Sequence, residues 1–325
     1  MLADWGQRSP RWAGVRSELV DVCGTSVHVL RADGPPDATP LLLVHGLGGS
    51  ATNWLEVLRP LSRVGPVLAP DLPGFGRTEP PARRAPRVEA NTRFLRALLD
   101  AVGWDRAVVV GNSMGGTMAV LLAAREPDRA ERLVLVAPAL PAPLRHLPQL
   151  PKETFRRFAP FLVPGLGRTV LRRMWGRMSP EELWVDSAAF VHGDPGRVSV
   201  ELREVGIEGL RHGREHDWRL HGLAVAAESV VGAVTTRRLL LRAIDAVAVP
   251  TLVIWGAKDR LVGRPVIDGL VQRRADLELR VLEGVGHVPQ IEAPDAFVEV
   301  ARRWLTDGGR RASTAVGPGD LVLPA

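Results

Sequence analysis

Short apolar runs alternate with amphipathic stretches along most of the chain. Between the apolar runs, Asn91–Val102 and Pro294–Leu305 each place apolar side chains on one helical face. Several apolar runs are continuous in valine and leucine, which is typical of strands buried on both faces of a parallel sheet. The alternation therefore predicts an α/β fold with a mostly parallel, eight-stranded sheet flanked by helices. The eight predicted strands are Leu19–Cys23, Ser26–Leu30, Leu41–Val44, Pro66–Ala69, Ala107–Val110, Leu133–Val136, Thr251–Trp255 and Leu279–Leu282.

The alternation stops after Pro138 and resumes near Val249. Residues 139–245 begin with several prolines and continue with helical patterns, without a buried strand. We expect them to form a helical insertion between two parts of the core, residues 1–138 and 246–305. The last stretch, residues 306–325, has no periodicity, and we expect it to be a disordered tail.

Composition removes several classes of chemistry from the 325 residues. The chain has no tyrosine, so no phenol acts as acid, base or nucleophile, and its single cysteine forms neither an intrachain disulfide nor a cysteine-rich metal site. Of 42 basic residues, all but Lys152 and Lys258 are arginines, an excess typical of GC-rich coding sequences. The net charge of +6 is modest for this length, and we expect no nucleic-acid partner.

The chain shows no targeting or membrane-spanning signal. Residues 1–17 carry arginines and tryptophans without the apolar segment of a signal peptide, so we expect a cytoplasmic location. The uncharged run Ala107–Ala124 has the length of a membrane span, but glycines and polar residues at its centre favour a strand, a turn and a helix.

That run contains the motif that carries the chemistry. The segment Ala107–Gly116 reads AVVVGNSMGG, a strand leading into G-x-S-x-G and then a helix. The glycines permit a sharp, strained turn, which lifts the hydroxyl of Ser113 clear of the sheet. A serine hydroxyl is a weak nucleophile until a base removes its proton, so a histidine and an acid are needed elsewhere.

Candidates for both follow later strands of the sheet. Asp259 comes just after the strand at 251–255, and His287 comes shortly after the strand at 279–282. Because loops at the carboxyl ends of parallel strands share one edge, we expect Ser113, Asp259 and His287 to converge. The glycine-rich loop HGLGG after the strand at 41–44 lies at the same edge, where a backbone N–H, together with that of Met114, would bind an oxyanion.

Together these elements resemble the α/β-hydrolase family over about residues 19–305. The matching strings are HGLG, DLPGFG, GNSMGG, WGAKD and GHVPQIEAP. The resemblance implies that Ser113 is the nucleophile, His287 the general acid/base and Asp259 its orienting partner, with Leu47 and Met114 as oxyanion donors. It also implies that the insertion at 139–245 is a cap over the active site. This chemistry uses no cofactor or metal, and we expect none.

Other residues near these motifs can be interpreted in two ways, as structural or as functional. Gly46, Trp54 and Val288 are candidate substrate contacts, although a core position suits Trp54 equally well. We expect His45 to be hydrogen-bonded under the oxyanion loop and Asp71 to fix a loop. His212 and His216 have a spacing that could bind a metal, but with no clear third ligand we favour a solvated helix face.

The insertion contains a strongly basic segment. Residues 145–177 hold eight basic residues against the single acid Glu153, a net charge of +7, interleaved with apolar residues. This pattern suits peripheral docking on an anionic membrane, which would place the protein at the inner membrane face. The competing interpretation is that the apolar residues close the substrate pocket while the arginines face water.

The residues also discriminate among reactions of the family. Haloalkane dehalogenases and epoxide hydrolases use an aspartate at the position of Ser113, and epoxide hydrolases also need cap tyrosines, so both are excluded. Hydrolysis of a carboxylic ester with a lipophilic part, through an acyl-enzyme, is the reading we favour. Carbon–carbon bond hydrolases of the meta-cleavage type share GNSMGG, but usually have HGxGPG and a tryptophan where Val288 stands. They remain an alternative, as do cofactor-free haloperoxidases or perhydrolases and a non-catalytic receptor.

Overall fold

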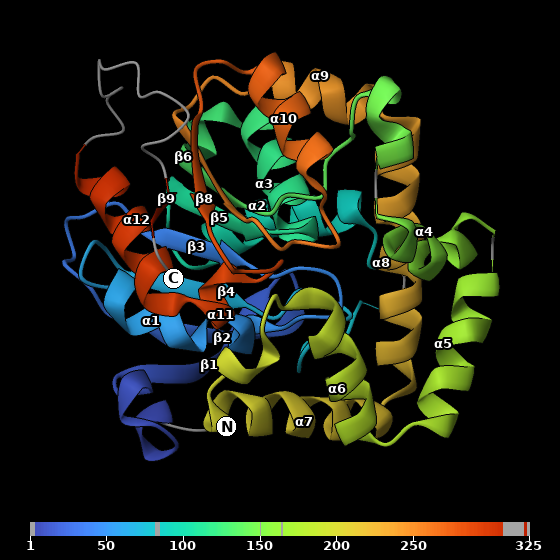
Figure 1. The fold of residues 1–325 in the computed structure, drawn as a ribbon. Helices are drawn as coiled ribbons and strands as arrows, with labels where there is room; N and C mark the ends of the chain where they lie inside the picture. The colour runs from blue at the N-terminus through green and yellow to red at the C-terminus, as the bar shows by residue number, and fades with distance from the viewer. Residues whose placement is uncertain (1–3, 82–84, 150, 164, 308–321, 324–325) are drawn as a thin grey trace.

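The computed structural model describes residues 4–81, 85–149, 151–163, 165–307 and 322–323, and its centre is a single twisted sheet (Figure 1). The strand order is β1-β2-β4-β3-β5-β6-β7-β8-β9. Strand β2 is antiparallel to both neighbours, and the other pairs are parallel. The strands are β1 Val15–Val22, β2 Thr25–Ala32, β3 Leu41–Val44, β4 Val67–Pro70, β5 Ala107–Asn112, β6 Ala130–Val136, β7 Thr251–Gly256, β8 Glu278–Leu282 and β9 Val322–Leu323.

The eight predicted strands are confirmed, and the ninth was not foreseen. Val322–Leu323 pairs with β8 inside the stretch that the sequence predicts as a disordered tail. That stretch also begins in a helix, because α12 continues through Thr306. The rest of the predicted tail, residues 308–321 and 324–325, lies outside the described residues.

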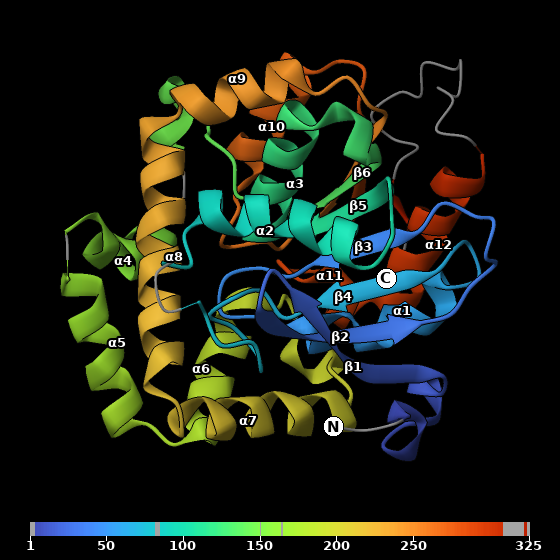
Figure 2. The ribbon, with the colours of Figure 1, turned by 180° about the vertical axis from the view of Figure 1, so that it is seen from behind.

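Helices cover both faces of the sheet, and the alternation of side chains along the strands explains the two cores. On β5, Val109 packs with α2, α3 and α10 on one face, whereas Val108 and Val110 pack with α1 and α12 on the other. Both layers are visible in Figure 2. The core helices are α1 Leu55–Leu61, α2 Val88–Ala101, α3 Met114–Arg125, α10 Arg264–Arg273, α11 Pro289–Glu292 and α12 Pro294–Thr306.

Between β6 and β7 the described residues form helices and no strand, as the sequence predicts. Helices α4 to α8 stand together beside the sheet (Figures 1 and 2), whereas α9 packs on α3 in the core, with Leu240 fully buried. These helices are α4 Lys152–Phe158, α5 Leu166–Arg177, α6 Pro180–Val191, α7 Val200–Arg214, α8 Asp217–Thr236 and α9 Arg238–Ala246. We call α4 to α8 with their connections the cap.

Short 3₁₀ helices complete the described elements. They are η1 Trp5–Gln7, η2 Pro10–Trp12, η3 Ala51–Trp54, η4 Pro127–Arg129, η5 Leu144–Gln149, η6 Ala159–Leu162 and η7 Pro195–Arg197. Within the described part of the chain, no helix combines the length and the apolar character needed to cross a bilayer. The uncharged run at 107–124 is β5, a turn and α3, as the sequence predicts.

Candidate active site

Ser113 occupies a strained turn between β5 and α3. Its φ of 55° and ψ of −114° lie in a region that residues other than glycine rarely adopt. The backbone N–H of Ser113 donates to the carbonyl of Val136 at 2.9 Å, which fixes the turn against β6. A Cβ at Gly111 would lie 2.4 Å from the carbonyl oxygen of Gly115, and one at Gly115 would lie 2.1 Å from that of Val44. Both glycines of the motif are therefore required by close backbone packing.

Asp259 and His287 form a buried pair at the carboxyl ends of β7 and β8. His287 Nδ1 donates to Asp259 Oδ2 at 2.8 Å, and both side chains are almost completely buried. The other carboxylate oxygen of Asp259 accepts the N–H groups of Leu261 and Val262. Because Nδ1 is engaged, Nε2 is the nitrogen left for Ser113, whose hydroxyl makes no hydrogen bond among the described residues.

Two residues that sequence reasoning did not single out hold the histidine loop in place. Asn112 Nδ2 donates to the carbonyls of Val136 and His287, both at 3.1 Å, which ties that loop to the residue before Ser113. The buried carboxylate of Glu292 accepts the N–H of Gly286 at 2.7 Å and two N–H groups of the cap, those of Gly193 and Asp194. Asn112 lies in the string GNSMGG and Glu292 in the string GHVPQIEAP, so these two motifs could have pointed to them.

The glycine-rich loop after β3 lies against the nucleophile. A Cβ at Gly46 would be 3.1 Å from the Cβ of Ser113, so this loop passes directly beside the turn. Met114 is the first residue of α3, where backbone N–H groups have no partner within the helix. Leu47 and Met114 are thus placed beside Ser113, and their role as oxyanion donors stays a prediction.

His45 and Asp71 lie where the sequence interpretation placed them. His45 Nε2 accepts the N–H of Leu72 at 3.1 Å, so Nδ1 donates to the carbonyl of Gly46 at 2.8 Å. Burial lowers the pKa of His45, which keeps the ring neutral under the loop. The Asp71 carboxylate accepts from His28 Nδ1 at 2.7 Å and from two backbone N–H groups.

A small cavity of about 180 Å³ borders the oxyanion loop. Val288 lines it, as expected for a substrate contact, but Gly46 and Trp54 do not. Trp54 is fully buried against Phe297, so of its two interpretations the structure supports the core position and not the substrate contact. The apolar side chains around this cavity are Trp184, Val191, Leu202, Val205, Val288 and Ile291.

The cap contributes a buried histidine to the same cavity. His192 follows α6, and its Nδ1 donates to the carbonyl of Ala188 at 3.1 Å. Burial lowers the pKa of His192, an effect that nearby His287 reinforces, so its Nε2 is an unprotonated acceptor. This nitrogen has no hydrogen-bond partner in the described part of the chain. The sequence analysis did not single out His192.

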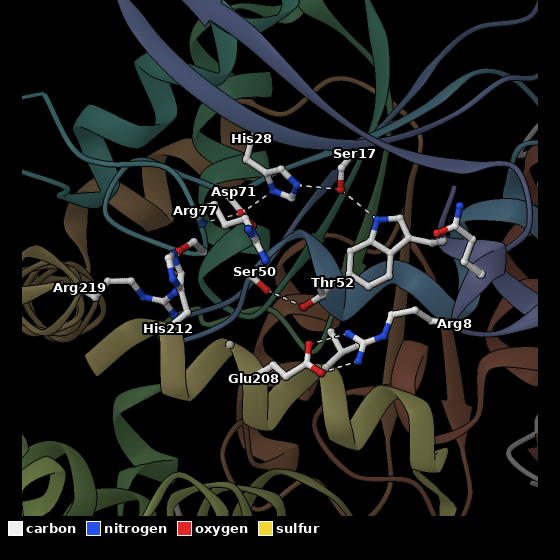
Figure 3. A pocket seen from close by; sticks show the side chains of 15 residues that line it. Arg8, Ser17, His28, Ser50, Thr52, Asp71, Arg77, Glu208, His212 and Arg219 are labelled. Atoms are coloured by element: carbon white, nitrogen blue, oxygen red, sulfur yellow. Dashed lines mark hydrogen bonds and ion pairs between the residues drawn. The ribbon is translucent and has the colours of Figure 1, made fainter. Parts of the chain in front are cut away.

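A larger cavity of about 560 Å³ adjoins the small one (Figure 3). Ser113, Asp259 and His287 are not among the residues that line either cavity. The two cavities share Ser50, Thr52, Val205, Gly209 and Arg219. Arg77 and His212 approach Arg219 in its wall, and Arg8 is paired with Glu208 farther along.

The Arg219 guanidinium is largely desolvated, donates to the carbonyl of Gly76 and forms no ion pair within the described chain. Burial lowers its pKa, the charge of Arg77 lowers it further, and Asp71 opposes both effects. The larger cavity therefore carries a surplus of positive charge.

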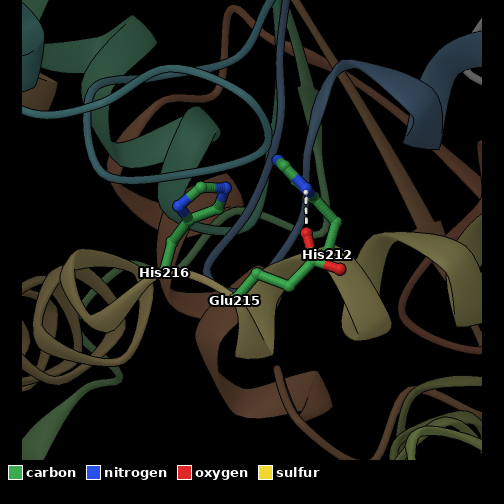
Figure 4. A group of neighbouring side chains, drawn as sticks. All are labelled: His212, Glu215 and His216. Atoms are coloured by element: carbon green, nitrogen blue, oxygen red, sulfur yellow. Dashed lines mark hydrogen bonds and ion pairs between the residues drawn. The ribbon is translucent and has the colours of Figure 1, made fainter.

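His212 and His216 have a neighbour that the sequence interpretation overlooked. Glu215 lies between them, and the ligand atoms of the three residues lie within 4.8 Å of one another (Figure 4). Burial lowers the pKa of His212, and His216, Arg77 and Arg219 add to that effect by repulsion. The three side chains are of the types that bind metal ions. The positive charges of Arg77 and Arg219 would repel a cation, so the surroundings do not favour metal binding.

A family profile described as alpha/beta hydrolase fold matches residues 39–294, about four fifths of the chain. The chain belongs to the α/β-hydrolase fold family. Strands β1 to β8 form the mostly parallel sheet that the resemblance implies, and the chain is a hydrolase of this family.

Curated relatives of this hydrolase cover most of its length. A 2-hydroxy-6-oxononadienedioate/2-hydroxy-6-oxononatrienedioate hydrolase of Dechloromonas aromatica is 28% identical over 82% of this chain and 86% of its own. A 2-hydroxy-6-oxo-6-phenylhexa-2,4-dienoate hydrolase of Burkholderia cepacia is 29% identical over 82% of this chain and 88% of its own.

Among solved structures, a bacterial membrane phospholipase A aligns with a TM-score of 0.68, 27% identity and coverage of 92% of this chain and 88% of its own. A 2-hydroxy-6-oxo-6-phenylhexa-2,4-dienoate hydrolase of a Rhodococcus species aligns with a TM-score of 0.73, 22% identity and coverage of 89% and 98%. At that identity the second likeness concerns the fold alone.

Proposed function

We propose that this hydrolase cleaves a carbon–carbon bond beside a ketone in a small substrate that carries a carboxylate. The curated relatives are named for such substrates, so they favour the alternative of the sequence analysis over ester hydrolysis. The structural observation that carries the proposal is Arg219, which belongs to the walls of both cavities and forms no ion pair among the described residues. With Arg77 beside it, this wall suits an anionic group of the substrate.

In this proposal each candidate catalytic residue has one role. Ser113 Oγ attacks the ketone carbon while His287 Nε2 takes its proton, and Asp259 stabilises the imidazolium that forms. The N–H groups of Leu47 and Met114 bind the negative oxygen.

When the carbonyl re-forms, the carbon–carbon bond breaks. This requires that the 2-hydroxydiene first tautomerises, its hydroxyl proton moving to the carbon beside the 6-ketone, so that this carbon becomes saturated and the rest of the chain becomes an enone. The leaving carbon then keeps the electron pair, which the enone delocalises, and it receives the proton from His287. Water activated by His287 then releases the acid and restores Ser113. No cofactor or metal takes part in these steps.

The test compares the wild type with Ser113→Ala, using one substrate and one covalent label. We expect the wild type to consume 2-hydroxy-6-oxo-6-phenylhexa-2,4-dienoate, followed by its absorbance, and Ser113→Ala to lose at least about a thousandfold in rate. A fluorophosphonate should label the wild type and leave the variant unlabelled. Absence of any turnover of the dienoate by a labelled, folded enzyme would contradict the carbon–carbon proposal. Absence of labelling would instead favour the receptor reading.

Ester hydrolysis is the second candidate, and the lining of the small cavity favours it. Apolar side chains, including Val288 directly after His287, surround the oxyanion loop there. Such a surface suits a lipophilic acyl or alcohol group, and the phospholipase A structure aligns at 27% identity. A series of p-nitrophenyl esters of increasing acyl length, run beside the dienoate, separates the candidates through the ratio of kcat/KM values. The same esters with hydrogen peroxide present report perhydrolase activity.

A further inference from the structure

The outer part of the cap exposes a cluster of large apolar side chains. Nine large hydrophobic residues are exposed among the described residues, and five of them lie within residues 144–166. Single exposed apolar residues are normal on a protein surface and need no partner. Several of them on one short segment instead indicate an interaction surface. Four of the five belong to the cap, namely Phe155 (66% exposed), Leu162 (50%), Val163 (51%) and Leu166 (45%), whereas Leu144 (66%) lies on η5, which contacts α10 of the core. We call residues 152–163 and 165–177 the basic cap face.

Positive charge lies on the same segment and is mostly not neutralised. Arg157 pairs with Asp186 of α6. Six other basic side chains of this face are exposed and form no ion pair within the described part of the chain: Lys152, Arg156, Arg168, Arg172, Arg173 and Arg177. The single acidic residue of the segment, Glu153, cannot balance them.

The helices that carry this face bury very little. Neither α4 nor η6 contains a buried residue, and α5 buries only Gly167. Figures 1 and 2 show α5 as the outermost helix of the cap, beyond α8 and on the side away from the sheet. Neither of these two cavities is lined by a residue of 144–177, which favours a surface role over the competing interpretation that these apolar residues close the substrate pocket.

We infer that the basic cap face docks on the surface of a membrane that contains anionic lipid. The exposed side chains of Phe155, Leu162, Val163 and Leu166 enter the headgroup region, where the arginines and Lys152 meet lipid phosphates. A nucleic acid would use the positive charge and leave the aliphatic side chains in water. This binding is peripheral, and it is independent of which bond the enzyme cleaves.

Sedimentation with lipid vesicles tests the inference on the full chain. Vesicles of phosphatidylcholine alone are compared with vesicles that contain about one third phosphatidylglycerol, at low and high salt. We expect binding to the anionic vesicles at low salt, at least about tenfold weaker binding to the neutral ones, and loss of binding as salt rises.

Three variants separate the contributions of charge and apolar contact. Arg168→Glu/Arg172→Glu/Arg173→Glu should weaken binding about a hundredfold or more, since each basic residue near the surface contributes. Phe155→Ser/Leu162→Ser should weaken binding and leave its salt dependence unchanged. The control Arg63→Glu/Arg93→Glu/Arg242→Glu makes the same charge change at exposed positions outside the face and should bind within about threefold of the wild type.

Two results would overturn the inference. One is absence of binding to anionic vesicles at low salt, and the other is an equal loss in the control variant, which would show attraction to net charge alone. Binding to a single-stranded RNA probe without binding to vesicles would also count against it. Fluorophosphonate labelling of each variant confirms that it is folded, because Ser113 is remote in sequence from all the substituted positions.

Discussion

At the scale of single residues, the candidate active site contains a strained backbone turn and buried neutral histidines, each of which lowers the free energy of unfolding. Ser113 adopts a backbone conformation that costs a residue with a side chain about 1–3 kcal/mol. His45 and His192 are buried as neutral rings, although histidine is readily protonated in water. Each of these costs is measurable through the free energy of unfolding.

Two substitutions of Ser113 separate catalysis from strain. Both Ser113→Ala and Ser113→Gly remove the hydroxyl, so both should lose hydrolase activity. Glycine adopts the positive φ without the clash of a Cβ, so Ser113→Gly should be more stable than Ser113→Ala by about 1 kcal/mol in urea unfolding. Equal stabilities would mean that the turn is not strained.

The buried histidines predict loss of stability on mild acidification. Burial lowers the pKa of His192 and of His45, so below a pH of about 6.5 the unfolded chain binds protons that the folded protein does not. The free energy of unfolding should therefore fall as the pH decreases from neutrality. His192→Phe should be less stable at neutral pH through the lost bond to Ala188, yet should lose less stability on acidification. Urea titrations at several pH values measure both effects, and parallel curves for the two proteins would refute the assignment.

At the scale of elements, the arrangement of the sheet could be predicted from local sequence, whereas the attachment of the cap to the core could not. Continuous valine and leucine runs predict buried parallel strands, and the glycines at 111 and 115 place the sharp turn before α3. The contact of Glu292 with Gly193 joins residues 99 positions apart, and no local pattern indicates it. Strand β9 likewise depends on a contact between distant segments, namely its pairing with β8.

Glu292 should support both stability and catalysis by joining two elements. Glu292→Gln replaces an oxygen that accepts N–H groups with an amide that donates, so at least one buried N–H loses its partner. We expect a loss of about 1–3 kcal/mol in unfolding free energy and a lower kcat, because the loop that carries His287 is held less firmly. Glu299→Gln, at an exposed position on α12, is the matched control. A stable Glu292→Gln enzyme with full kcat would contradict this role.

At the scale of the whole molecule, the cavities exist because the cap and the core meet. Arg77 comes from a loop after β4, His212 from α7 and Arg219 from α8, and only the folded chain brings them into one wall. Residue types and spacing therefore predicted the candidate catalytic residues and gave no indication of the positive cavity. For the same reason they left Trp54 open between a core position and a substrate contact, because its neighbour Phe297 is on the distant helix α12.

Arg219 should determine affinity for anionic substrates without affecting the chemical step. Arg219→Met should raise KM for the carboxylated dienoate about tenfold, the effect of losing a charged hydrogen bond, and should leave kcat/KM for a neutral p-nitrophenyl ester nearly unchanged. Arg238→Met, on the exposed side of α9, is the control. An equal loss toward both substrates would show that Arg219 acts only on the fold.

The link between α6 and the loop after β8 has a mechanical consequence. The backbone N–H of His287 donates to the carbonyl of Val191, the last residue of α6, at 2.7 Å. An outward swing of α6 must either break that bond or pull the histidine backbone with it. Any movement of α6 and the position of the His287 backbone are therefore expected to be coupled.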